Sequence, residues 1–310
     1  MTYADSKKRK VSLVAYFWKR RWLYLMSLPG LAFLIIFKYI PMYGVIMAFQ
    51  DFSFKIGVFG SPFIGLAHFQ QLFGSDKFVQ VFSNSLLLSV ARLVFSFPIP
   101  IILALLINEI RVKAYKKTAQ TLMYLPHFLS WIVLGGITAN FLSMTDGLIN
   151  DLIAVLGGQR INFLGSNEWF RFVIIITNIW KEAGWGTIIY LAGLSAISPD
   201  LYEAATVDGA NRWQRILHVT LPGISSTVVI MLVLAVGGLM NNGFEQVYLF
   251  QNDLNIAVSD VFETYTYKIG IVSGRYSYST AVGLFKNVIA TVLIFSSNRI
   301  AKKLGGATLY

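Results

Sequence analysis

The chain has 310 residues, of which 55% are hydrophobic and 13% are charged, and its formal net charge is +11. Soluble domains usually carry about 25% charged residues, so this composition excludes an ordinary soluble protein and indicates one that crosses a membrane several times. Because the chain has no cysteine, disulfide bonds and cysteine-based metal sites are also excluded.

Six stretches with few charged residues are each long enough for a helix that crosses a bilayer, which takes about 20 apolar residues. Lipid offers no hydrogen-bond partners to the backbone, so each stretch must be helical. We expect Pro41 to kink the first. In chain order, the predicted spans lie near residues 22–50, 78–108, 118–145, 170–197, 219–244 and 278–300. They define an all-α transmembrane domain, residues 22–303, between a basic N-terminal segment, 1–21, and a tail, 304–310.

The lysines and arginines outside the spans are distributed unequally between the two ends of the predicted bundle. Sixteen lie in the termini and in the loops after spans two and four, and six lie in the other loops. Cytoplasmic loops carry the excess of positive charge, so both termini are predicted to be cytoplasmic. This distribution accounts for the net charge without a nucleic-acid partner. The sequence has no Gly-x-x-x-x-Gly-Lys-Ser/Thr motif, so we do not expect this chain to bind nucleotide through a P-loop.

The cytoplasmic loop between spans four and five has the residues of a helix, a glycine break and a second short helix. Ser198 can cap the first helix, with Pro199 at its first position. Gly209 can end that helix in the left-handed conformation. Asn211 can cap the second helix, which we expect to finish before Pro222. These residues alone are also compatible with an ordinary amphipathic connector.

The same loop, residues 198–222, contains Glu-Ala-Ala, then a glycine four residues later, and ends in Val-Thr-Leu-Pro. This pattern resembles the EAA loop of ATP-binding-cassette (ABC) importer permeases. The resemblance implies coupling helices that lie in a groove of an ATPase subunit, where small alanines allow close approach and the glutamate anchors the helix. The residues expected to take part are Glu203, Ala204, Ala205, Asp208, Gly209, Arg212 and Trp213.

Further motifs, spread over nearly the whole chain, resemble oligosaccharide permeases of the LplB and alginate-transporter type. Their members include Phe37-Lys-Tyr-Ile-Pro-Met-Tyr-Gly, Leu125-Pro-His-Phe-Leu-Ser-Trp and Asn178-Ile-Trp-Lys-Glu-Ala-Gly-Trp. The resemblance implies a type I ABC importer permease with six transmembrane helices in a bacterial plasma membrane. The additional helices and large outer domain of the maltose-type first subunit are missing from this sequence.

The resemblance also implies the partners of such a permease. They are a second homologous permease subunit, two ATP-binding subunits, and an extracellular or periplasmic sugar-binding protein. ATP and magnesium would bind to the ATPase partner, so no cofactor and no enzymatic activity are expected of this chain. The transported solute is expected to be an oligosaccharide.

Sugars bind to aromatic faces and to hydrogen-bonding groups, and polar residues inside spans usually face the bundle interior. In span three, His127 and Trp131 are four residues apart and are expected on one helix face. In span four, four residues follow an i, i+3, i+4, i+7 pattern. The resemblance implies sugar contacts at several of these positions and at an asparagine in span five. The predicted substrate-binding residues are His127, Ser130, Trp131, Asn178, Lys181, Glu182, Trp185, Asn241, Asn242 and Gln246.

Several alternatives stay open at this point. Lys181 and Glu182 could form ion pairs between helices, and the two tryptophans could be packing residues. Arg92 and Lys286 are interpreted as structural or as reaching towards the membrane surface, and the role of Lys38 is undecided. The solute could be a neutral sugar, a uronide or a non-sugar compound. An ion-coupled transporter or a membrane enzyme is disfavoured, because acidic residues and histidines are few and scattered within the spans.

Overall fold

The computed structural model describes residues 18–303. Regular secondary structure in this range is helical, apart from a single antiparallel bridge between Gln50 and Phe63. The all-α prediction is therefore confirmed for the described residues. The predicted cytoplasmic segments at the two ends fall largely or wholly outside this range.

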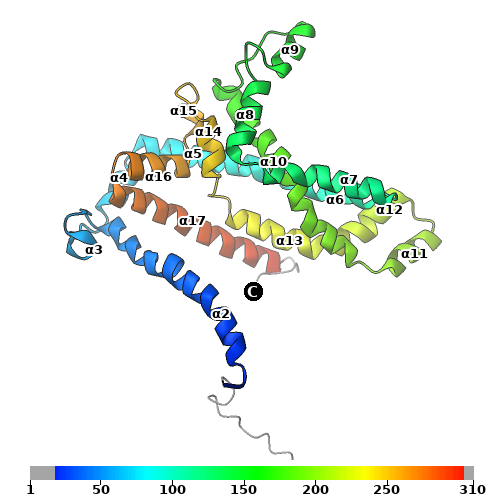
Figure 1. Ribbon diagram of the computed structural model, residues 1–310, viewed down its shortest axis with the longest axis horizontal. Coiled ribbons are helices and arrows are strands. Elements are labelled where there is room, and N and C mark those ends of the chain that lie inside the picture. Colours follow the sequence, from blue (N-terminus) through cyan, green and yellow to red (C-terminus); the bar gives the residue numbers. More distant parts are fainter. Residues whose placement is uncertain (1–17, 304–310) are drawn as a thin grey trace, which may run out of the picture.

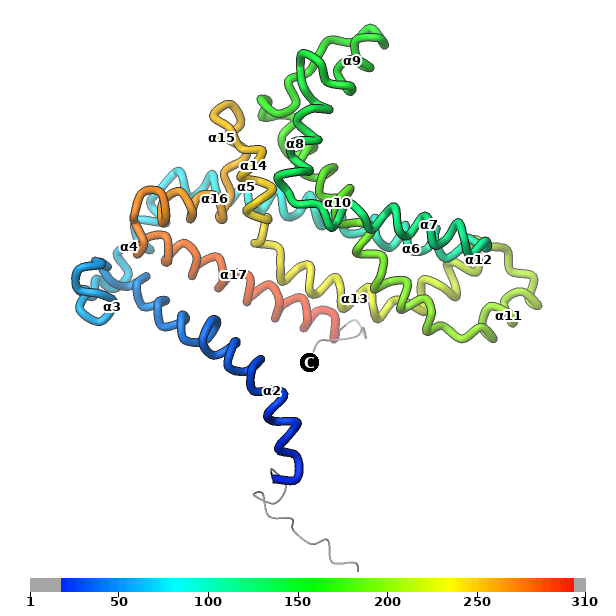
Figure 2. Tube along the Cα trace, viewed as in Figure 1, coloured from blue at the N-terminus to red at the C-terminus, as the bar shows by residue number. Residues whose placement is uncertain are grey.

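The first span runs from Arg21 to Phe49 and changes its helical type twice. It consists of α2 (Arg21–Leu34), a π-helical turn η1 (Ile35–Tyr39) and a 3₁₀ segment η2 (Ile40–Phe49), which has Pro41 in its first turn. None of the residues of α2 is buried, and the helix extends away from the other helices (Figures 1 and 2). In a membrane, α2 must therefore be covered by lipid or by another chain.

Five long helices form the main bundle: α5 (Asp76–Phe95), α6 (Pro98–Asn108), α10 (Asn167–Ser195), α13 (Leu221–Gly237) and α17 (Tyr276–Lys303). α10 packs against α6 and α13, and α13 packs in turn against α17. Ala104, Tyr190, Leu194 and Ile224 form the buried cluster where α6, α10 and α13 meet. The apolar residues of these predicted spans thus supply the interior of the bundle as well as its lipid-facing surface.

The third predicted span is sharply bent. α7 (Lys113–Tyr124) continues as a 3₁₀ turn η3 (Leu125–Phe128), and α8 (Trp131–Phe141) leaves it at an angle of 101°. Pro126 lies in the first turn of η3, and the hydroxyl of Ser130 caps α8 by accepting a hydrogen bond from the Val133 backbone N–H. The continuous helix on which His127 and Trp131 were expected to share a face is therefore absent. α8 and the following helix α9 (Leu148–Val155) project from the bundle (Figure 1).

The segment after the fifth span folds back onto the bundle. It contains α14 (Phe244–Phe250), α15 (Ile256–Ser259), α16 (Phe262–Tyr267) and a π-turn η5 (Lys268–Val272). Val247, Val261 and Phe262 are fully buried against neighbouring helices. Two short helices, α3 (Gly57–Gly60) and α4 (Ala67–Phe73), connect the first span to α5. Residues predicted to form a simple outer loop therefore belong partly to the protein interior.

Four helices in the described residues are long and apolar enough to cross a membrane, and the bent pair α7–α8 makes five. All six predicted spans coincide with helices, but α10 carries Glu168, Arg171, Lys181 and Glu182 and is not among the helices that are long and apolar enough to count as spans. A sixth crossing by α10 stays a prediction.

Candidate functional site

The bend in the third span lies against α10, and a histidine joins the two. His127 Nδ1 lies 2.9 Å from Glu182 Oε2. The imidazole ring also stacks on the indole of Trp185, with 4.5 Å between ring centroids and 5° between planes. Trp185 keeps 44% of its surface exposed, so the stacked pair still presents aromatic surface beside a carboxylate. The three predicted residues are thus brought together.

Lys181 is buried and binds the broken end of η3. Its Nζ donates hydrogen bonds to the backbone carbonyl oxygens of His127, at 2.7 Å, and Leu129, at 2.5 Å. Carbonyl groups at a helix C-terminus have no partners within the helix, and a cation stabilises them. The ammonium also lies 5.4 Å from the ring centroid of Trp131. Lys181 therefore holds the bend, and its donors are largely occupied.

The bend shows that His127 and Trp131 do not share one helix face, although their spacing of four residues predicted it. The two residues lie on opposite sides of the bend, in η3 and in α8, and not on one continuous helix face. They come close because both adjoin Lys181. By contrast, α10 is unbroken from Asn167 to Ser195, so the i, i+3, i+4, i+7 pattern in span four does lie on one helix.

A glycine allows α7 to approach α10 closely beside this group. A Cβ atom at Gly184 would lie 1.9 Å from the backbone oxygen of Met123, which is far inside van der Waals contact.

Asn178 of α10 is half-buried, and its side-chain amide has no hydrogen bond to another described residue. Ser130 is exposed but already caps α8. Asn178 is therefore free to meet a ligand.

Asn242 and Gln246 lie elsewhere, in a buried polar network. Ser89 donates to Asn242 Oδ1 at 3.1 Å, and Asn242 Nδ2 donates to the Ser85 carbonyl at 3.3 Å. Gln246 Nε2 donates to the Thr177 hydroxyl and to a backbone carbonyl of α10, both at 2.8 Å. Both side chains are essentially inaccessible, so in this conformation they order the bundle and do not face a cavity. Asn241, beside them, is exposed.

The same network contains three charged residues. Arg92 Nη2 donates to Gln246 Oε1 and its Nη1 to the Asn242 carbonyl, both at 2.6 Å. Glu263 Oε1 accepts from the Asn242 backbone N–H at 3.3 Å and from Lys286 Nζ at 2.6 Å. Arg92 and Lys286 are thus structural, as interpreted from the sequence. Glu263, which forms an ion pair with Lys286, was missed because it was assigned to an outer loop.

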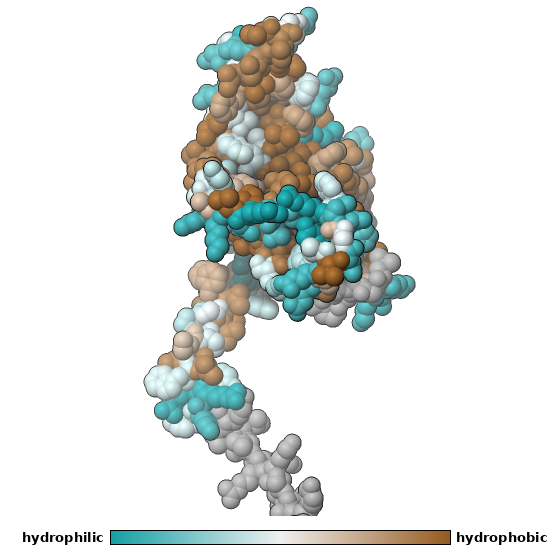
Figure 3. Space-filling view, turned by 90° about the vertical axis from the view of Figure 1, so that its right-hand side faces the viewer, coloured by the Kyte–Doolittle hydropathy of each residue, from teal (hydrophilic) through white to brown (hydrophobic). Residues whose placement is uncertain are grey.

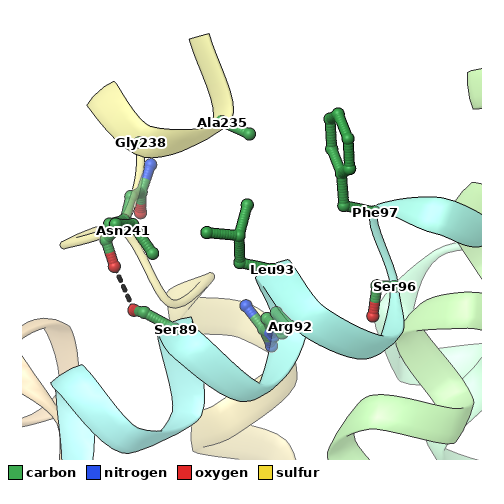
Figure 4. Close-up of a pocket in the computed structure, with 9 residues that line it drawn as sticks. Ser89, Arg92, Leu93, Ser96, Phe97, Ala235, Gly238 and Asn241 are labelled. Carbon is green, nitrogen blue, oxygen red and sulfur yellow. Dashed lines mark hydrogen bonds between the residues drawn. The ribbon is translucent and has the colours of Figure 1, made fainter. Parts of the chain in front are cut away.

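A cavity of about 230 Å³ lies beside Arg92. Ser89 and Leu93 of α5, with Phe97 just before α6, face the end of α13 across it, and Asn241 lies at its edge (Figure 4). The Ser89 hydroxyl also lies within hydrogen-bond distance of the Leu239 carbonyl there, so its single proton is shared between that oxygen and Asn242 Oδ1. Its walls are mainly apolar, with serine hydroxyls, the arginine and one amide among them. The cavity can hold a small group that combines apolar and hydrogen-bonding surfaces.

The loop between α10 and α13 has the predicted helix–glycine–helix form. α11 (Pro199–Val207) is capped by the Ser198 hydroxyl, and Gly209 has a φ of 77°, in the left-handed region. Asn211 and Gln214 form a capping box at the start of α12 (Arg212–Arg215). These local predictions from the sequence are confirmed.

One expectation for this loop was wrong. The second helix does not finish before Pro222 but continues through a π-turn, η4 (Ile216–Thr220), into α13, giving one helix from Arg212 to Gly237. Proline lacks the N–H that an α-helix needs and its ring clashes with the carbonyl four residues earlier. The wider π-turn immediately before it accommodates both effects.

The loop occupies one end of the molecule. Glu203, Arg212 and Trp213 are exposed, Trp213 by 73%. Figure 1 shows α11 and α12 at the same end of the molecule as the start of α7, which carries Lys113 and Lys116, and Figure 3 shows this end as mostly hydrophilic. A hydrophilic, exposed helix pair at the end of a bundle can contact another protein.

Comparison with known proteins gives a consistent result. The family of binding-protein-dependent transport system inner membrane components matches residues 96–306. Protein LplB of Bacillus subtilis is 47% identical over 97% of this chain and 94% of its own length. The polygalacturonan/rhamnogalacturonan transport system permease protein YteP of the same species is 45% identical over 98% and 95%.

A solved structure agrees over the full length. It is a bacterial ABC transporter involved in the import of the acidic polysaccharide alginate, and one of its chains superposes with a TM-score of 0.87 at 41% identity, covering 94% of this chain and 98% of that one. Because the similarity extends over nearly the whole length of both chains, it is not confined to one motif. This chain therefore belongs to the family of binding-protein-dependent transport system inner membrane components, as a multi-pass membrane protein.

Proposed function

We propose that this chain is the membrane-spanning subunit of an ABC importer that takes up an oligosaccharide delivered by an extracellular or periplasmic binding protein. The observation that carries the proposal is its similarity over the full length to an alginate-importer chain and to YteP. A second solved structure, similar with a TM-score of 0.88, is that transporter in complex with an alginate-bound periplasmic protein. This supports a sugar-binding protein as one partner.

The other partners are a second, homologous permease subunit and two ATP-binding subunits. α11 and α12 form the contact with an ATP-binding subunit, with Glu203, Ala204, Ala205, Asp208, Gly209, Arg212 and Trp213 at the contact. Support comes from their exposure and from their place at the hydrophilic end of the bundle. This end faces the cytoplasm of a bacterial cell, as do both termini.

Sugar contacts are proposed at the group around the bend. His127, Trp131, Glu182 and Trp185 combine aromatic faces with a carboxylate and an imidazole, and Asn178 offers a free amide. Ser130, at the bend, and Asn241, at the edge of the Arg92 cavity, are exposed and complete the proposed contacts. Lys181, Asn242 and Gln246 support the site by holding the backbone that carries it.

Transport follows from alternating access about a site within the bundle. ATP binding draws the two ATP-binding subunits together and moves the α11–α12 segments of both permeases. The helices attached to those segments then reorient, and the site opens to the binding protein. Hydrolysis returns it to the cytoplasmic side. The sugar undergoes no chemical change.

The test is uptake by proteoliposomes that contain this chain, its partner permease, the ATP-binding subunits and the binding protein. Tritium-labelled trigalacturonate, maltotriose, dialanine and phosphate are the probes. ATP-dependent uptake of a saccharide is expected. Uptake of dialanine or phosphate alone would indicate a non-sugar importer, and uptake driven by an ion gradient without ATP would contradict the proposal.

Glu203→Lys tests the coupling contact in the same vesicles. It should insert normally yet abolish saccharide uptake and stimulation of ATP hydrolysis by the loaded binding protein, because it reverses a charge at the subunit contact. Asp253→Lys, an exposed charge reversal in the α14–α15 loop, is the control and should transport normally. Normal uptake by Glu203→Lys would refute the assigned contact.

A further inference from the structure

A groove of about 620 Å³ separates α8 and α9 from the first half of α10. Residues 131–166, which contain α8 and α9, are called the arm below. None of the described residues that line the groove is charged. The hydroxyls of its two threonines donate to carbonyls of their own helices, Thr138 to Leu134 at 2.8 Å and Thr177 to Val173 at 2.7 Å. With no charge in its described wall and its hydroxyl protons engaged, the groove suits an apolar occupant.

The groove lies on the face of α10 that points away from the proposed sugar contacts. Trp169, Ile176 and Trp180 line it, and the last two keep 47% and 44% of their surface exposed. Asn178 and Glu182 each follow one of these exposed residues by two positions, which is about 200° round an α-helix. Polar residues inside a transporter face its interior. The opposite face of α10, with the groove, therefore points towards lipid.

The groove has the length of one leaflet of a bilayer. From Trp169 to Trp180, α10 rises by about 16 Å at 1.5 Å per residue, and the hydrocarbon core of a bilayer is about 30 Å thick. Trp180 adjoins Lys181 at the bend, and transporter sites lie near the bilayer midplane. Trp169 lies near the end of α10 that is opposite to α11. With α11 in the cytoplasm, as proposed above, the groove spans the outer leaflet.

The outer surface of the arm is apolar as well. Figure 3 shows the part of the molecule that contains α8 and α9, at the top of the view, as mostly hydrophobic. Leu152 and Val155 on α9 are 52% and 84% exposed. The arm contains three charged residues, and two of them, Asp151 and Arg160, bind each other at 2.6 Å. Large apolar surfaces are rarely exposed to water, so the arm is expected to lie against lipid.

We propose that the groove holds one acyl chain of an outer-leaflet phospholipid, with the arm lying over that chain at the membrane surface. The inference rests on the proposed function for the orientation of the chain. Trp169 lies in edge contact with Phe163, at 5.2 Å between ring centroids, where tryptophan is typical of the membrane–water interface. α8 begins at Trp131, which adjoins Lys181. A lipid that fixes the arm against α10 therefore also helps to fix the bend.

The first experiment measures how deep the two groove tryptophans lie in lipid. The purified complex of this chain with its partner permease and ATP-binding subunits is placed in nanodiscs of phosphatidylcholine that carries bromine, a contact quencher of tryptophan, near the carbonyl or near the terminal methyl of an acyl chain. Subtracting the emission of Trp169→Phe or Trp180→Phe from that of the wild type isolates each indole. Deep bromine should quench Trp180 about twofold more than shallow bromine does, and the order should reverse for Trp169. Quenching of neither would show that water or a protein partner covers the groove, and would overturn the proposal.

A groove-filling variant distinguishes a lipid bound in the groove from lipid that only touches α10. Ile153→Trp adds an indole ring inside the groove, and Val292→Trp adds the same ring to an exposed position of α17. Native mass spectrometry counts the phospholipids that each purified complex retains. The wild type and Val292→Trp should retain about one more phospholipid than Ile153→Trp, because the added ring occupies the space of the acyl chain.

Equal retention by Ile153→Trp and the wild type, or no phospholipid retained by the wild type, would overturn the groove as a lipid site. Ile149→Phe, a smaller addition to the same groove, gives the same comparison if Ile153→Trp does not assemble. ATP-dependent saccharide uptake by proteoliposomes tests the proposed function separately. Uptake of phosphate or dialanine in place of a saccharide would refute that function and leave the quenching and the lipid count unchanged.

Discussion

Lys181→Met removes the ammonium group that holds the bend while keeping the length of the side chain. In the wild type that group donates to the carbonyls of His127 and Leu129. A hydrogen bond to a charged group contributes about 1.5–3 kcal/mol in soluble proteins, whereas side-chain hydrogen bonds in a membrane protein average about 0.6 kcal/mol. Two such bonds, offset by the easier burial of methionine, give an expected loss of about 2 kcal/mol.

Two measurements check this expectation. Unfolding of the purified complex, followed by circular dichroism, gives the change in stability. Spin labels at Lys116→Cys and Ile132→Cys, on α7 and α8, report the bend by electron–electron distance, and the absence of native cysteine makes the labelling specific. The distance distribution should broaden in Lys181→Met.

The matched control is Lys38→Met in the first span. Lys38 is exposed, and no hydrogen bond from its ammonium to another described residue was found, so stability should not fall. If Lys181→Met were as stable as the wild type and kept a narrow distance distribution, the bend would be set by Pro126 and the packing of α8 alone. The role assigned to Lys181 would then be wrong.

Two glycines give further predictions. Gly184→Ala should reduce assembly or shift the unfolding midpoint downwards, because the new methyl group meets the Met123 carbonyl; Gly136→Ala, with open space around it, is the control, and equal stability of the two would show that α7 can move aside. Gly209→Ala should cost about 1 kcal/mol, since its φ of 77° disfavours a side chain, and should slow ATP-dependent uptake without blocking insertion. Uptake and stability equal to wild type would contradict the need for the left-handed turn.

The local signals in the sequence predicted the α11–α12 segment well because its determinants are contained within a few neighbouring residues. A capping serine followed by proline, a glycine at the break and an asparagine cap each act on the adjacent turn. The continuation past Pro222 could not be read in the same way. It depends on a π-turn, and the sequence has no periodic signal for the extra residue in that turn.

The candidate site was only partly predictable because its contacts join segments far apart in the chain. The Asn178–Trp185 pattern was sound, since it lies within one helix. The break after Phe128 was not foreseen, so Lys181 was assigned to the ligand when its partners are backbone carbonyls created by that break. Glu263 lay in a stretch too polar and too short for a span, and only the folding of α16 onto α5 and α17 shows that it is an interior residue.

The unbroken helix from Arg212 to Gly237 has a mechanical consequence. Its 26 residues span about 39 Å at 1.5 Å per residue. One end begins in the exposed α12 turn and the other ends beside Gly238 and Asn241, at the wall of the Arg92 cavity. A tilt of about 10° imposed at α12 would displace the far end by about 7 Å if the rod stays straight. The π-turn before Pro222 thus joins a loop and a span into a single lever arm, and small movements at its exposed end become larger ones at the Arg92 cavity.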